Sequence, residues 1–149
     1  MIVKCVAALP TPEQAKRLGK HYRAGKQAFV VVPGTEYVVF ALKTLGGEPW
    51  VEIADPALEP GYLFGVPLCL FEIVNPRPSA LWETRVTNDG ELELSPASLL
   101  RDYYHDDLFE GVHEVVEDFL RLRKELEKEA SLHRRAGSSL TILGPDKES

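Results

Sequence analysis

Short runs of alternating or continuously apolar residues occupy much of the chain up to residue 94 and predict β-strands. These runs span residues 2–8, 27–32, 36–42, 50–54, 66–74, 81–87 and 91–94. Turn-forming residues separate several of them, as at Pro33-Gly34, Gly46-Gly47 and Asn88-Asp89-Gly90. Because consecutive strands are joined by short turns, we expect a mostly antiparallel, meandering sheet of six or seven strands.

A first helix is predicted directly after the first strand. Thr11 can cap it, Pro12 suits the first helical turn, and Gln14 can complete a capping box. The helix is expected over residues 12–24 and should stop at Gly25, because glycine readily adopts the backbone conformation that ends helices.

The pattern changes after residue 94, where helical spacing replaces alternation. Ser95-Pro96 is expected to open a short helix to about Tyr104, and Asp107 with Glu110 to open a long one to about Ser131. Apolar residues of the long helix recur at steps of four and three, at Leu108, Val112, Val115, Phe119, Leu122 and Leu126. That spacing places them on one face, which we expect to pack on the sheet in an α+β fold.

Length and composition fit a single domain with an ordinary core. The chain has 149 residues, and we expect one α+β domain over residues 1–136 and a tail over 137–149. The β-prone patch Leu140–Leu143 could add an edge strand or dock on a partner. No apolar stretch could span a bilayer, and the N-terminal region lacks the order of a signal peptide, so we expect a cytoplasmic protein without membrane contact.

The two cysteines point away from disulfide and zinc chemistry. Cys5 and Cys69 lie in apolar runs, and neither belongs to a C-x-x-C pair. In a chain without an export signal, we expect buried free thiols. No metal and no cofactor is expected, because the common phosphate-binding, metalloprotease and hydrolase motifs are also absent.

Charge is unevenly spread. The net charge is −6, yet residues 1–26 carry six bases against one acid, and residues 102–118 carry seven acids and no base. The basic first helix could touch phosphate or RNA, or it could be a solvated face. We favour the solvated face and expect no nucleic-acid partner, since the net charge is negative and no known RNA- or DNA-binding pattern occurs.

Three places could carry chemistry. His105, between Tyr104 and Asp106, could act as a general base or bind a metal, although nearby aspartates equally suit helix capping. Glu72 could be a proton donor with a raised pKa if its strand face is buried, or it could be wet or paired with Arg85. His113 and Glu117 share a helical face, as half of a metal site would, but an exposed surface explains them equally.

The charge pattern and the missing motifs lead to one hypothesis and two alternatives. The hypothesis is a non-enzymatic protein-binding module, of the inhibitor, immunity or adaptor kind, whose acidic surface binds a basic partner protein. That surface comprises Asp102, Asp106, Asp107, Glu110 and Glu114. One alternative is a small-molecule-binding or hydrolytic enzyme with a pocket between sheet and C-terminal helices, using Glu72, Tyr104 and His105. The other is a homo-oligomeric structural subunit built through the long helix and the tail.

Overall fold

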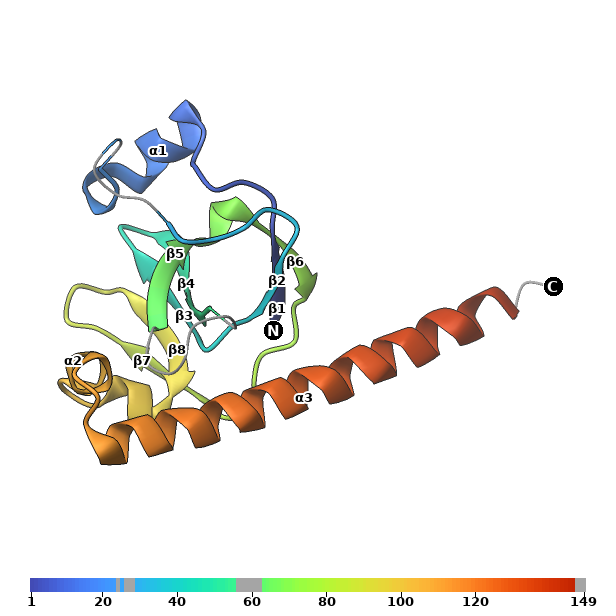
Figure 1. Ribbon diagram of the computed structural model, residues 1–149. Helices are drawn as coiled ribbons and strands as arrows, with labels where there is room; N and C mark the ends of the chain where they lie inside the picture. Colours follow the sequence, from blue (N-terminus) through green and yellow to red (C-terminus); the bar gives the residue numbers. More distant parts are fainter. Residues whose placement is uncertain (24, 26–28, 56–62, 147–149) are drawn as a thin grey trace.

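The computed structural model describes residues 1–23, 25, 29–55 and 63–146, with side chains up to Leu132, and shows an α+β fold (Figure 1). Its strands are β1 Ile2–Cys5, β2 Glu36–Val38, β3 Ala41–Leu45, β4 Glu48–Ala54, β5 Leu63–Pro67, β6 Phe71–Asn75, β7 Trp82–Val86 and β8 Leu92–Pro96. Its helices are α1 Pro12–Leu18, α2 Tyr104–Phe109 and α3 His113–Asp146, with short 3₁₀ turns η1 Gly19–His21, η2 Leu68–Leu70 and η3 Ala97–Leu100.

The strands pair antiparallel throughout, as predicted, but they form two sheets. One sheet has the order β2-β1-β6, and the other has the order β5-β4-β3-β8-β7. The expected strand over residues 36–42 is divided at the bend before Ala41, so β2 pairs with β1 while β3 pairs with β4 and β8. This division separates the sheets and lets neighbouring residues face different parts of the core.

A second expected strand is also interrupted. The apolar run 66–74 was predicted to be one central strand, but η2 separates β5 from β6. β5 pairs with β4 and β6 pairs with β1, so the run crosses from one sheet to the other. Residues 29–32 are not in a strand; the remainder of the strand expected over 27–32 lies outside the described residues.

The start of the first helix is confirmed in detail. The Thr11 hydroxyl accepts a hydrogen bond from the Gln14 backbone, and the Gln14 side chain accepts one from the Thr11 backbone. The helix ends earlier than predicted, because Gly19 has a positive φ of 58° and closes α1. Within the described residues, one turn of 3₁₀ helix, η1, follows.

The C-terminal helices differ from the prediction in their boundaries. Residues 95 and 96 belong to β8, and only η3 is helical before α2. The long helix expected from Asp107 is divided at Gly111. The φ of this glycine is 76°, whereas residues inside a right-handed α-helix have a negative φ. α2 starts at Tyr104 without a side-chain cap, so the expected capping by Asp107 and Glu110 is wrong.

The apolar face of these helices does pack as its spacing predicted. Leu108, Val115, Phe119, Leu122 and Leu126 are all buried. Val112 is the exception, because it lies in the joint between the two helices and is partly exposed. Figure 1 shows α3 running past the strands and projecting beyond them toward the C-terminus.

The backbone of residues 137–146 continues α3 and forms no strand. Docking of the Leu140–Leu143 patch on a partner stays a prediction. Both cysteines are free thiols, with Cys5 buried and Cys69 half-buried. Among the described helices, none combines the length and apolar character that crossing a bilayer requires.

Candidate functional site

The acidic residues singled out in the sequence lie on and beside α2. Asp102, Asp106, Glu110 and Glu114 are exposed, and Asp107 is half-buried. The structure therefore brings the predicted binding residues to one short stretch of the surface, at the start of the C-terminal helices (Figure 1). Residues 102–118 contain seven carboxylates and no lysine or arginine, so this stretch carries an excess of negative charge.

Large apolar side chains are exposed in the same stretch. Tyr103 is 75% exposed, Phe109 is 70% exposed, and Val112 is partly exposed. Tyr103 is also the one non-glycine residue with a positive φ, 63°, in the described part of the chain. Such a conformation costs a tyrosine free energy, so the surrounding structure holds it in place.

Buried neighbours fix this stretch to the core. Tyr104 and Leu108 are almost fully buried, one helical turn apart, and Leu108 packs with the residues of α3. The Tyr104 hydroxyl donates a hydrogen bond of 2.8 Å to Asp118 of α3. Burial and this bond raise the pKa of Tyr104, so the hydroxyl stays protonated and ties α2 to α3.

Glu72 does not join the other candidates. It lies exposed on β6, opposite Lys4 of β1, and it is not among the residues that line the cavity beside His105. Its expected partner Arg85 instead binds Glu93 on the adjacent strand. The three residues considered for a catalytic pocket are thus dispersed, since only His105 lines that cavity.

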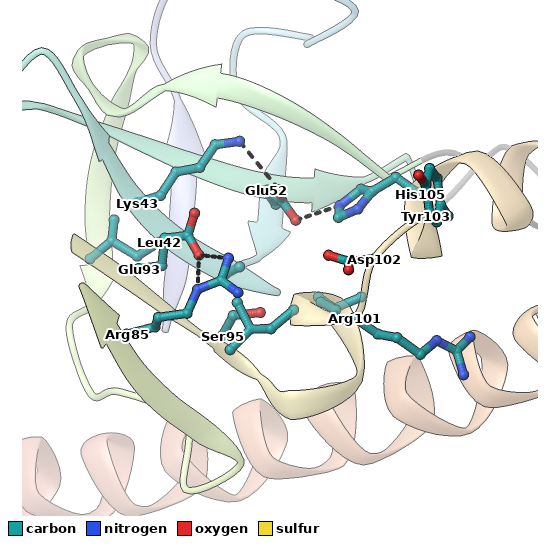
Figure 2. Close-up of a pocket in the computed structure, with 13 residues that line it drawn as sticks. Leu42, Lys43, Glu52, Arg85, Glu93, Ser95, Arg101, Asp102, Tyr103 and His105 are labelled. Atoms are coloured by element: carbon teal, nitrogen blue, oxygen red, sulfur yellow. Dashed lines mark hydrogen bonds and ion pairs between the residues drawn. The ribbon is translucent and has the colours of Figure 1, made fainter. Parts of the chain in front are cut away.

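The His105 cavity lies between β3, β4, β7, β8 and the segment Leu99–His105 (Figure 2). Its volume is about 290 Å³. Charged side chains from five separated parts of the chain face it, which only the tertiary fold brings together. They are Lys43, Glu52, Arg85, Glu93, Asp102 and His105.

Glu52 is the central group of this cluster. Its side chain is only 11% exposed, and it contacts His105 Nε2 at 3.1 Å and Lys43 Nζ at 3.5 Å through different oxygens. Figure 2 shows the Lys43 and His105 side chains approaching it from opposite sides. A buried carboxylate needs such partners, because an unpaired charge is costly to remove from water.

The two ionisable partners shift each other's pKa. Burial favours the neutral form of Glu52, but the hydrogen bond and charge of His105, with Lys43, outweigh burial and lower the Glu52 pKa below 4.5. The hydrogen bond to Glu52 raises the His105 pKa above 6.5, against the effect of burial. His105 is therefore a cation over a wider pH range than an isolated histidine.

The opposite side of the cavity holds a second ion pair. Arg85 donates from Nε at 3.0 Å and from Nη2 at 2.6 Å to one oxygen of Glu93. The pair joins β7 to β8 directly across the ladder. Because the two opposite charges cancel, the pair leaves the net charge of the cavity unchanged. Its contact helps to hold β7 and β8 together at the cavity wall.

Sequence reasoning missed Glu52, Lys43 and Glu93. Glu52 did carry a signal, because it is the one charge between the apolar residues Trp50 and Ile53 in a strand that reads as buried. Its partner His105 is 53 residues away, and no spacing rule connects positions at that separation. Only the pairing of β3 with β4 and the placement of α2 bring the three groups together.

The remaining candidates are ordinary surface features. His113 Nε2 contacts Glu117 at 3.1 Å with both side chains largely exposed. The described bases of the first helix, including Lys16, Arg17 and Lys20, are exposed as well. Within the described residues, no group of three or more His, Cys, Asp or Glu side chains is arranged to hold a metal ion.

The chain's chemistry must therefore be inferred from this surface and this cavity. Comparisons with protein-family models, with curated proteins and with solved structures found no match for the chain.

Proposed function

We propose that the chain is a non-enzymatic protein-binding module whose acidic surface binds a basic partner protein. The observation that supports it most is the combination on one short segment of exposed carboxylates with exposed Tyr103 and Phe109. We call this segment, residues 102–114, the α2 surface. Aromatic side chains are enriched at the centres of protein interfaces, where they bury much area at little entropic cost.

The anchoring of the α2 surface favours binding. Tyr104 and Leu108 are held in the core, so Asp106, Phe109 and Glu110 are presented from a helix whose position is fixed. A surface ordered before the partner arrives loses less conformational entropy on association. The positive φ of Tyr103 fits this reading, since strained conformations cluster at binding sites.

Charge would act mainly on association rate and partner choice. The whole chain carries a net charge of −6, and its acids concentrate in this region. Complementary charge speeds diffusional encounter and disfavours acidic partners through like-charge repulsion. The exposed apolar groups would then set how long the complex lasts.

A comparison of three forms of the chain tests the proposal. The surface variant carries Asp106→Asn, Glu110→Gln and Glu114→Gln, which remove charge with little change of shape. The control variant carries Glu13→Gln, Glu72→Gln and Glu83→Gln, at exposed positions on other elements. Each form is immobilised, exposed to a lysate of its own organism at low and moderate salt, and the bound proteins are quantified by mass spectrometry.

The expected result is a basic protein retained by the wild-type chain and the control variant but lost from the surface variant. Retention should also fall as salt rises, because exposed charges are screened. The proposal is contradicted if the surface variant retains the same proteins as the control, or if the wild-type chain retains none.

A further inference from the structure

The His105 cavity opens beside the α2 surface, and the two share residues. Asp102, Tyr103 and His105 belong to the α2 surface and also line the cavity. Cavities that take drug-sized ligands have volumes of about 300 to 1,000 Å³. At about 290 Å³, this cavity lies at the lower end of that range and has room for one long side chain of a docked protein.

The charged groups of the cavity differ in how they are paired. Glu52, Glu93 and Asp102 are its carboxylates, and Lys43 and Arg85 are the permanent cations that face them, with His105 as a further cation while it is protonated. Arg101 also lines the cavity, but its guanidinium lies over the Tyr104 ring, 5.4 Å from the ring centre. Figure 2 shows that guanidinium pointing away from the other charged groups.

Asp102 is the group that lacks a countercharge. Lys43 is bound to Glu52, and Arg85 is bound to Glu93 through two hydrogen bonds. Within the described residues, the Asp102 side chain makes no hydrogen bond and no ion pair. An incoming cation therefore finds Asp102 available as a countercharge.

We infer that the His105 cavity receives an arginine side chain of the partner protein, with Asp102 as its countercharge. This inference rests on the proposed function and adds the residue type that the partner must present. Arginine suits the site better than lysine because its planar guanidinium can bind a carboxylate with two parallel hydrogen bonds and can stack on an aromatic ring. Asp102 supplies the carboxylate and Tyr103 supplies the aromatic ring, and both line the cavity.

An arginine in the cavity would also give the strained conformation of Tyr103 a role in binding. Its positive φ turns the chain into α2, and its ring is exposed while it lines the cavity. A tyrosine at a cavity mouth can cover the stem and guanidinium of a bound arginine. Arginine residues buried in such pockets are frequent sites of large binding energy at interfaces.

Small probes test the inference without the partner. N-acetyl-L-arginine amide is titrated into the full chain labelled with ¹⁵N, and the amide shifts are followed. N-acetyl-L-citrulline amide, of the same shape but without charge, is the matched ligand control. Asp102→Asn is the test variant, and Glu13→Gln is the protein control, because Glu13 is exposed on α1 and does not line the cavity.

Saturable shifts at Tyr103, His105 and Glu52 are expected with the arginine probe. Citrulline and the Asp102→Asn variant should each weaken binding by about tenfold, which corresponds to about 1.4 kcal/mol for the lost charge pair. Glu13→Gln should bind as the wild type does. Equal responses to arginine and citrulline, or unchanged binding by Asp102→Asn, would overturn the inference.

The outcome separates this inference from the proposed function. If the surface variant loses its partner but arginine does not bind the cavity, the proposed function stands and the cavity inference fails. If arginine binds through Asp102 while the surface variant retains all that the control retains, the cavity is a cation site and the proposed function fails.

Discussion

At the scale of single residues, Glu52 and His105 depend on each other. Glu52 is nearly buried and would be costly to keep charged without partners, and His105 holds a proton more readily because Glu52 accepts its hydrogen bond. Lys43 and Asp106 are the other charged groups that act on His105, the first lowering and the second raising its pKa. The pair therefore joins α2 to β4 through a contact that depends on the protonation of both side chains.

The stability that this pair contributes should have a defined pH window. Because the folded-state pKa of His105 is raised above 6.5, its contribution is complete below pH 6.5 and is lost as pH rises through the raised value. Because the pKa of Glu52 is lowered below 4.5, its contribution is complete above pH 4.5 and is lost as pH falls through the lowered value. The contribution is largest between these two limits.

The His105→Asn variant tests this window by urea unfolding over a series of pH values. The difference in unfolding free energy from wild type should be largest between pH 4.5 and 6.5. Its size should be at most about 1 kcal/mol, because His105 is partly exposed to solvent. The control is His113→Asn, whose ion pair is exposed and should leave the wild-type profile unchanged. A difference that does not vary with pH would contradict the prediction.

At the scale of elements, the spacing of apolar residues predicted which helical face is buried, but it did not predict where the helices begin and end. The buried face of residues 108–126 follows from spacing alone, because residues three and four apart share one side of a helix. The break at Gly111 was not predicted, although glycine is the residue most able to adopt the positive φ found there. The break turns the chain between α2 and α3 and leaves Val112 exposed.

Adjacent residues on α3 allow a direct test of that face. Phe119 is almost fully buried and stacks on Phe40 of the bend between β2 and β3, with ring centres 5.5 Å apart, whereas Leu120 is exposed. Phe119→Ala should reduce the unfolding free energy by about 3–5 kcal/mol through lost burial and a cavity. Leu120→Ala should change it by no more than about 0.5 kcal/mol. Similar losses for both variants in urea unfolding would refute this orientation of α3.

At the scale of the whole molecule, two apolar clusters share the same strands. One contains Val39 and Ile53 with the residues of the first sheet, and the other contains Phe40 with α2 and α3. Val39 and Phe40 are neighbours in sequence, so the bend between β2 and β3 belongs to both clusters. Because neither cluster can separate without disturbing this bend, we expect the described domain to unfold as one cooperative unit.

Leu108→Ala tests this cooperativity from one end of the molecule. Leu108 lies in the helical cluster, so the change should lower the unfolding free energy by about 2–5 kcal/mol. The unfolding midpoint should move equally in far-UV circular dichroism, which reports α3, and in tryptophan fluorescence, which reports Trp50 on β4 and Trp82 on β7. Fluorescence that kept the wild-type midpoint would show that the sheets unfold independently.

The sequence by itself determined what depends on local preference and periodicity. The α+β class, the antiparallel pairing, the capping box at Thr11, the Asn88-Asp89-Gly90 hairpin and the buried helical face all follow from residues close together in the chain. The concentration of acids near α2 was equally visible, because it is a property of composition.

Only the tertiary structure decided how distant segments combine. The division into two sheets depends on which strands pair across long separations, and the cavity depends on Glu52 of β4 meeting His105 of α2. It also dispersed the residues first considered for catalysis, leaving Glu72 exposed and directing the Tyr104 hydroxyl to Asp118. Such contacts follow from the packing of whole elements, and no local pattern encodes them.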